Sequence, residues 1–246
     1  MTPPPKLLVD ADYFFYRSAC AAEEEHEYSQ DLTVIVGSFT KGKQVVEHEL
    51  NKLRQRFNTD DLVLFFTDQK NFRKTVDPSY KGNRTKRKPC GYLKLKNWGI
   101  ETYPSEMYPN LEADDVLGIV ATNGSLGNFV LVSPDKDLGQ IPCRIFDLKE
   151  EYTQTPERAE RLLYKQCLMG DATDGYKGCV GCGPKRADQI LDKVKDKNYW
   201  PAVVEAYKEA EMTEDDALRN LRLAKILQAD GWDPVNQVPI LITPNV

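Results

Sequence analysis

The chain has 246 residues, 41% of them hydrophobic and 29% charged, with a formal net charge of −5. This length and composition allow a sizeable core and exclude a disordered protein, a fibre and a small disulfide scaffold. No apolar run approaches the roughly 20 residues that a membrane-spanning helix needs, and the start has no signal-peptide pattern. We therefore expect a globular protein of the cytoplasm that does not bind a membrane.

Six cysteines are spread along the chain, and a reducing compartment favours free thiols. Cys179 and Cys182 have the spacing of half a zinc site. No second pair lies at zinc-finger spacing and the chain has only two His, so we expect a tight turn here instead.

In the first part of the chain, short apolar runs alternate with helical patterns. The predicted strands are residues 6–10, 61–68, 100–103 and 128–133. Residues 46–57 and 112–122 are predicted helices. This alternation predicts an α/β fold with a mostly parallel central sheet flanked by helices.

From Thr155 the pattern becomes helical, with Thr155 as N-cap and Pro156 at the first helical position. We divide the chain into an α/β core at residues 1–160 and a helical part at residues 161–246. Residues 193–246 add apolar helical spacing and a Pro-containing tail, and carry little functional signal.

Nine carboxylates are expected to converge at one edge of the sheet, because active sites of open parallel sheets form beyond the carboxyl ends of the strands. Some directly follow predicted strands, some open the helix at residue 112, and two follow a later helix. They are Asp10, Asp68, Glu112, Asp114, Asp115, Asp135, Asp137, Asp171 and Asp174. Each alone is more often a turn residue or a helix cap, whereas nine together indicate a site.

Such a cluster requires cations, since two like charges about 4 Å apart repel by roughly 1 to 4 kcal/mol. Oxygen ligands without His or Cys favour Mg²⁺ or Mn²⁺ over zinc. Two such ions are typical of in-line phosphodiester hydrolysis.

The basic residues are concentrated between Lys70 and Lys96, where ten Lys or Arg stand against one acid, Asp77. Phosphate binding requires such clustering, and a solvated charged face is the alternative interpretation. The glycines from Lys177 to Ala187 predict a helix-hairpin-helix over about residues 175–192, which would bind phosphate through backbone amides. A Walker loop is not supported, because Pro184 and Lys185 follow Gly183; an ordinary glycine-rich connector is the other alternative.

In their order along the chain, these motifs resemble the 5′-nuclease family of flap endonucleases and 5′ to 3′ exonucleases. The resemblance covers roughly residues 6 to 192, and the lack of a polymerase segment is similar to the stand-alone bacteriophage members. Its motifs are Leu-Val-Asp10, Phe-Thr-Asp68, Arg73, Tyr80-Lys-Gly-Asn-Arg84, Glu112-Ala-Asp-Asp115, Ser133-Pro-Asp-Lys-Asp137, Gly170-Asp-Ala-Thr-Asp174 and Gly183-Pro-Lys-Arg-Ala187.

The resemblance implies a PIN-like core, a helical arch at about residues 70–96 and a role for each motif. Asp10, Asp68, Glu112 and Asp114 match the first metal cluster, and the other five acids match a more peripheral one. Lys81 and Arg84 match catalytic basic residues at the base of the arch, beside which a 5′ single strand passes. The residues expected to contact DNA are Arg73, Lys74, Tyr80, Lys86, Arg87, Lys88, Gly181, Gly183, Lys185 and Arg186. Tyr80 and Tyr92 are candidates to stack on bases, with core burial as the alternative.

The implied function is metal-dependent 5′ to 3′ exonuclease or flap endonuclease action on DNA near single-strand to duplex junctions, leaving 5′-phosphates. The implied ions are two Mg²⁺ or Mn²⁺, with K⁺ at the hairpin, and the implied state is a monomer in the cytoplasm, that of the host for a bacteriophage protein. RNA in RNA–DNA hybrids is left open as a further partner. A non-catalytic structure-specific DNA-binding protein and a PIN-type ribonuclease are the alternatives. At the hairpin, Cys179, Cys182 and the Gly-Tyr-Lys after Asp174 depart from the family pattern.

Overall fold

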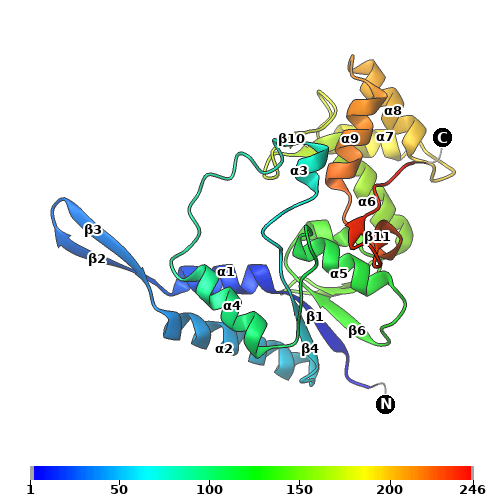
Figure 1. Ribbon diagram of the computed structural model, residues 1–246. Coiled ribbons are helices and arrows are strands. Elements are labelled where there is room, and N and C mark those ends of the chain that lie inside the picture. The colour runs from blue at the N-terminus through cyan, green and yellow to red at the C-terminus, as the bar shows by residue number, and fades with distance from the viewer. Residues whose placement is uncertain (1–2, 245–246) are drawn as a thin grey trace.

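The computed structural model describes residues 3–244, which are built around a six-stranded sheet (Figure 1). The strand order is β5-β4-β1-β6-β7-β8, and every neighbouring pair is parallel except β7 and β8. The strands are β1 (Lys6–Asp10), β4 (Leu62–Phe65), β5 (Ser105–Glu106), β6 (Phe129–Val132), β7 (Arg144–Phe146) and β8 (Glu151–Thr153). The predicted mostly parallel α/β fold is confirmed.

Both faces of the sheet are buried, because alternate residues of each strand point to opposite sides. Leu7 and Val9 pack with α1 (Ala11–Ala21), α2 (Phe39–Phe57) and α4 (Tyr92–Thr102). Leu8 and Leu131 pack on the other face with α5 (Ala113–Thr122) and η1 (Lys136–Gln140). The end of the chain returns to this second face through η2 (Ala229–Gly231), β11 (Trp232–Asp233) and β12 (Val238–Pro239), where Trp232 is buried.

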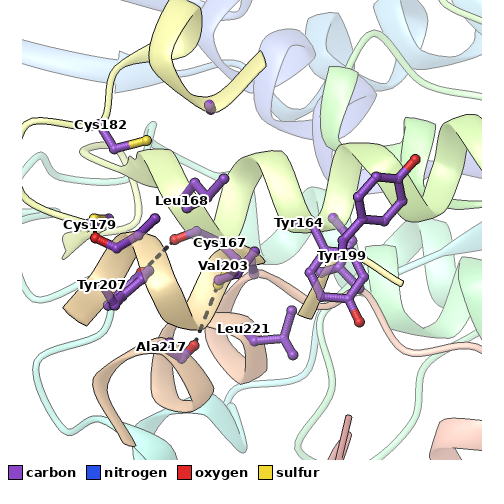
Figure 2. Close-up of a cluster of buried hydrophobic side chains, with 14 of the residues drawn as sticks. Tyr164, Cys167, Leu168, Cys179, Cys182, Tyr199, Val203, Tyr207, Ala217 and Leu221 are labelled. Carbon is purple, nitrogen blue, oxygen red and sulfur yellow. Dashed lines mark hydrogen bonds between the residues drawn. The ribbon is translucent and has the colours of Figure 1, made fainter. Parts of the chain in front are cut away.

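A second core lies among the helices α6 (Pro156–Met169), α7 (Pro184–Leu191), α8 (Trp200–Glu209) and α9 (Glu214–Ala224), as Figure 2 shows. The turn between α6 and α7 carries a short pair of strands, β9 (Gly170–Asp171) and β10 (Tyr176–Lys177). Cys167, Cys179 and Cys182 line this core as thiols. All six cysteines are free, as predicted.

Two elements differ from the sequence-based predictions. Strands β2 (Glu23–Ser29) and β3 (Leu32–Gly37) form an antiparallel hairpin that projects away from the body (Figure 1) and was not predicted. Its acidic strand lacks the apolar alternation by which strands are recognised. The predicted strand at residues 100–103 instead belongs to the end of α4 and the residue after it, since Gly99 packs its helix closely on Phe15 and Phe66.

The predicted helical arch is mostly irregular. Only the single turn α3 (Arg73–Val76) is helical before α4 begins at Tyr92. Pro78, Gly82, Pro89 and Gly91 interrupt the segment, and Gly91 has the positive φ of 77° that ends or begins a helix. The basic segment, residues 77–91, is therefore a chain of turns. Within residues 3–244 no helix has the length and apolar character needed to cross a membrane.

Candidate metal centre and nucleic-acid path

Acidic side chains follow three of the strands at the carboxyl edge of the sheet. Asp10 is the last residue of β1, and its Oδ2 accepts a 2.7 Å hydrogen bond from Ser133 Oγ, directly after β6. Asp68 follows β4, and its carboxylate accepts from the backbone N–H of Asn110 at 2.8 Å. That bond lowers the pKa of Asp68.

The buried Asp10 and the half-buried Asp114 form the centre of this acidic group. Burial, together with the charges of Asp12 and Asp135, raises the pKa of Asp10 to about 7, although the hydrogen bond from Ser133 lowers it. Burial likewise raises the pKa of Asp114, in the first turn of α5, and the charges of Asp10, Asp135 and Glu112 add to the shift. These carboxylates are therefore close enough to repel one another.

Asp137 lies between this centre and the helical part of the molecule. Its Oδ1 accepts a 2.7 Å hydrogen bond from Gln166 of α6. Burial, with the charges of Asp135, Asp171 and Asp174, raises its pKa to about 6. Asp137 is therefore affected by the charges of three other predicted peripheral acids, Asp135, Asp171 and Asp174.

Glu112 and Asp174 are held in a network with the first residues of the basic segment. Tyr80 Oη donates to Glu112 at 3.0 Å and to Asp174 at 2.7 Å, and Lys81 Nζ donates to Glu112. Burial raises the pKa of Glu112, but Lys81 and Arg73 outweigh it and hold that pKa below its usual value. Arg84 completes the network with a 2.6 Å ion pair to Asp174.

Lys81 reaches this network through an unusual backbone conformation. Its φ is 56°, in the left-handed region, and its N–H donates to the carbonyl of Asp174 at 2.7 Å. Strain of this kind persists where surrounding contacts fix it, and it is common at functional sites. Lys81 and Arg84 consequently stand beside the carboxylates, as the resemblance implied.

Asp115 and Arg73 depart from their predicted roles. Asp115 is fully buried, and its two oxygens accept hydrogen bonds from the Arg73 guanidinium at 2.7 and 2.8 Å. Arg73 is 3% exposed, and it also donates to the carbonyls of Leu223 and Lys225. The pair joins α3, α5 and the chain after α9, so neither side chain is free for a metal ion or for DNA.

Tyr80 is also placed differently from the prediction. It is 2% exposed and packs in the helical core, so its ring has no free face for a base. Tyr92 is buried too, with its Oη donating to Asp12 at 3.0 Å. Both tyrosines support acidic residues instead of stacking on a nucleic acid.

Two further residues, Asp12 and Ser133, belong to the site but were not among the predicted site residues. Asp12 accepts from the backbone N–H of Thr67 at 2.9 Å and lies 3.8 Å from Lys96 Nζ. Ser133 holds Asp10. Asp12 had a sequence signal, because it lies two residues after Asp10 in the first turn of the helix that the strand feeds.

The donor chemistry fits divalent cations, although the acids are not a finished ligand set. Over residues 3–244, no three acidic, histidine or cysteine side chains are arranged to hold a metal ion as they stand. Glu112 and Asp174 are paired with Lys81 and Arg84, whereas burial and mutual repulsion dominate at Asp10 and Asp114. Buried oxygens that repel one another are the ligands that hard cations stabilise.

Apart from the buried Arg73 and Tyr80, the predicted DNA-contacting residues lie in two exposed regions. Lys74, Lys86 and Lys88 are exposed on or beside the basic segment, whereas Arg87 is bound to Glu23 by two hydrogen bonds. Around the hairpin, the exposed residues are Gly181, Gly183, Lys185 and Arg186. Arg186 lies 3.2 Å from Glu209.

The turn between α6 and α7 depends on close backbone contact. A Cβ at Gly178 would lie 2.3 Å from the backbone nitrogen of Gly170 and from the carbonyl oxygen of Leu168. Gly183 is the N-cap of α7 without a side chain, so the first amides of that helix are open to a ligand. This geometry suits a helix-hairpin-helix that binds phosphate.

A parallel sheet with acids at its carboxyl edge, beside a basic segment and a hairpin, defines a phosphodiester-cleaving enzyme. Residues 5–161 match the family model described as the N-terminal resolvase-like domain of 5′-3′ exonucleases. The chain belongs to this 5′-3′ exonuclease family and is a nuclease, which confirms the resemblance found in the sequence.

Similar proteins of known name include bacteriophage and bacterial nucleases. The exonuclease of Escherichia phage T7 is 28% identical over an alignment of 284 positions, which covers 97% of this chain and 93% of the relative. The flap endonuclease Xni of Shewanella frigidimarina is 24% identical, over 62% of this chain and 66% of its own.

Solved structures of similar fold include two of the flap endonuclease of bacteriophage T5. One, a complex with DNA and metal ions, has a TM-score of 0.62 at 20% identity and covers 90% of this chain and 89% of its own. The other, crystallised with metal ions, has a TM-score of 0.65 at 18% identity with the same coverage. These similarities show the fold.

Proposed function

We propose that this nuclease hydrolyses DNA phosphodiesters near single-strand to duplex junctions, using two Mg²⁺ or Mn²⁺ ions and leaving 5′-phosphates. The observation that carries the proposal is the mutually repelling pair of the buried Asp10 and the half-buried Asp114, beside Lys81 and Arg84. Repelling acids have no use in a protein that only binds phosphates. They therefore favour hydrolysis over the non-catalytic DNA-binding alternative.

The proposed ligand set divides into two groups. Asp10, Asp68, Glu112 and Asp114 would hold one ion, and Asp135, Asp137, Asp171 and Asp174 the other. When bound, such ions activate water and stabilise the leaving oxygen. Asp115 is left out, because it is committed to Arg73.

Lys81 and Arg84 would exchange their carboxylate partners for the scissile phosphate. In the free protein Lys81 neutralises Glu112 and Arg84 neutralises Asp174. With Glu112 and Asp174 each serving as a ligand of its own ion, Lys81 and Arg84 would be free of their carboxylate partners. These side chains would then stabilise negative charge that develops on the phosphate.

The remaining contacts would hold the substrate. Lys74, Lys86 and Lys88 would attract a 5′ single strand, and the hairpin amides with Lys185 and Arg186 would hold the duplex backbone, with K⁺ at the turn. We further propose a monomer that acts in the cytoplasm and accepts RNA in RNA–DNA hybrids. A PIN-type ribonuclease, the other alternative, would leave Asp171, Asp174 and the hairpin without a role.

The test is cleavage of a 5′-labelled flap duplex and a blunt duplex of the same sequence, with Mg²⁺ and with EDTA. Wild-type protein is expected to release labelled flap or mononucleotide only with Mg²⁺, and the ratio of the two products reports the dominant mode. Asp10→Ala should remove both activities. Tight binding of wild type without cleavage, in Mg²⁺ and in Mn²⁺, would establish the non-catalytic alternative.

A further inference from the structure

The basic segment is tied to the rest of the molecule at both ends. At its start, Lys81 donates to the carbonyl of Asp174, and Asn83 Nδ2 donates to the carbonyl of Ala172 at 2.7 Å. At its end, Arg87 and Cys90 are bound by Glu23, the first residue of β2. The span of the segment is consequently set by one anchor in the helical part and one at the base of the β2–β3 hairpin.

The Glu23 carboxylate accepts three hydrogen bonds. Its Oε1 accepts from Arg87 Nη1 at 2.5 Å and from the backbone N–H of Cys90 at 2.7 Å, and its Oε2 accepts from Arg87 Nη2 at 3.2 Å. These bonds hold the pKa of Glu23 at about 2. Its side chain is 21% exposed, while the neighbouring Glu25 is exposed. A bidentate pair with an added backbone bond fixes direction as well as distance.

Cys90 contacts both strands at the base of the hairpin. Gly37 pairs with Glu23 across the hairpin, and a Cβ at Gly37 would lie 2.3 Å from the carbonyl oxygen of Cys90. On the same strand, Ile35 accepts a 3.5 Å hydrogen bond from Cys90 Sγ. At this contact Glu23 thus supplies the charge, and the missing side chain of Gly37 leaves the space that the Cys90 backbone occupies.

Helix α4 connects the Cys90 contact with the acidic centre. Helix α4 begins two residues after Cys90, and its Tyr92 and Lys96 contact Asp12 and Thr67. The charge of Asp12 in turn raises the pKa of Asp10. Helix α4 therefore connects the hairpin base with Asp12, beside the acidic group.

We propose that Glu23 is a positioning residue that anchors the end of the basic segment and thereby sets the course of this segment, along which a 5′ single strand reaches the carboxylates. The proposal rests on the proposed function. It gives Arg87 a place in the anchor instead of the phosphate contact expected from the sequence.

Glu23→Gln tests the anchor, and Glu25→Gln on the same strand is the matched control. For the flap duplex we expect Glu23→Gln to raise KM roughly threefold to tenfold with kcat within about twofold, as loss of substrate positioning predicts. Cleavage of the blunt duplex should change less, because it has little single strand to guide. Glu25→Gln should match wild type on both substrates.

The double variant Glu23→Gln/Arg87→Gln separates anchoring from direct contact with DNA. If both residues act through one anchor, the double variant has the KM of either single variant. Multiplying effects would mean that Arg87 contacts phosphate on its own, which would overturn the assignment.

Limited trypsin cleavage after Lys86 and Arg87, without DNA, is a readout independent of activity. It should accelerate severalfold in Glu23→Gln and not in Glu25→Gln. An unchanged KM for Glu23→Gln overturns the positioning role even where trypsin cleavage accelerates. Failure of wild type to cleave either duplex would instead refute the proposed function and the positioning role with it, while trypsin still reports the anchor.

Discussion

We expect the Asp10 carboxylate to lower the free energy of unfolding of the metal-free protein. Burial, with the charges of Asp12 and Asp135, raises its pKa from 3.8 to about 7. Between these values the folded state keeps a proton that the unfolded chain has lost, so stability falls as the pH rises through this window. Asp10→Asn removes the charge and should raise the free energy of unfolding at pH 7.5 by about 1 to 3 kcal/mol.

Urea unfolding of wild type and Asp10→Asn in EDTA, at pH 5 and pH 7.5, measures this effect. The gain should be larger at pH 7.5, and the variant should be inactive. A variant that is less stable than wild type at both pH values would show that Asp10 is not repelled by its neighbours.

Asp114 and Asp115 are adjacent acids with opposite expected behaviour. Asp114 faces Asp10, whereas Asp115 is bound to Arg73 inside the protein. Asp115→Asn leaves a buried guanidinium without its charge partner and should cost about 3 to 5 kcal/mol. Asp114→Asn should cost little or stabilise the metal-free protein.

Thermal unfolding with and without Mg²⁺ checks this contrast. Mg²⁺ should raise the melting temperature of wild type by binding the folded state. Asp114→Asn should lose most of that rise, and a still folded Asp115→Asn should keep it. Equal loss of the rise in both variants would return Asp115 to the metal ligands.

The sequence could predict that these acids gather but not what each one faces. Asp10 and Asp68 follow strands, and parallel strands bring their carboxyl ends together whatever the side chains do. Asp115 differs from Asp114 only in pointing about 100° further around the same helical turn. Its partner Arg73 lies 42 residues away, so no local pattern reveals the pair.

At the scale of elements, the turn between α6 and α7 provides a matched pair of glycines. A Cβ at Gly178 would meet backbone at 2.3 Å, whereas nothing lies within 4 Å of one at Gly183. Gly178→Ala should therefore displace the turn, at a cost of about 1 to 3 kcal/mol, and weaken DNA binding. Gly183→Ala should keep the stability of wild type within about 1 kcal/mol.

Denaturant midpoints and duplex affinity at two salt concentrations measure both variants. Normal affinity in Gly178→Ala would place the duplex contact elsewhere than on this turn. Normal stability would show that the turn has room to relax.

Elements with strong local signals were predicted, and those without were not. Residues 155–169 carry an N-cap, a Pro at the first helical position and apolar spacing, and α6 begins and ends accordingly. The basic segment was expected to be a helical arch by resemblance, although its own Pro and Gly residues argue for turns. Strand β2 has four Glu among seven residues, and only pairing with β3 makes it a strand.

At the scale of the molecule, hydrogen bonds and core packing join the α/β and helical parts. Arg73 donates to the carbonyls of Leu223 and Lys225, which lie on the other side of the division predicted at residue 160. Gln140 donates to the carbonyl of Ala224 and accepts from the N–H of Ile226. Tyr80 packs in the helical core although it lies in the other part of the sequence. The parts therefore stabilise each other.

We consequently expect one cooperative unfolding transition, and no stable fold for residues 161–246 alone. That fragment would lack Tyr80 from its core and would leave the carbonyls of Leu223 and Lys225 without Arg73. Buried carbonyls without donors are costly, so the remaining helices would pack loosely. Calorimetry of the whole chain should give equal calorimetric and van't Hoff enthalpies. Two separate transitions, or a well-dispersed NMR spectrum of the fragment, would show instead that the helical part is an independent domain.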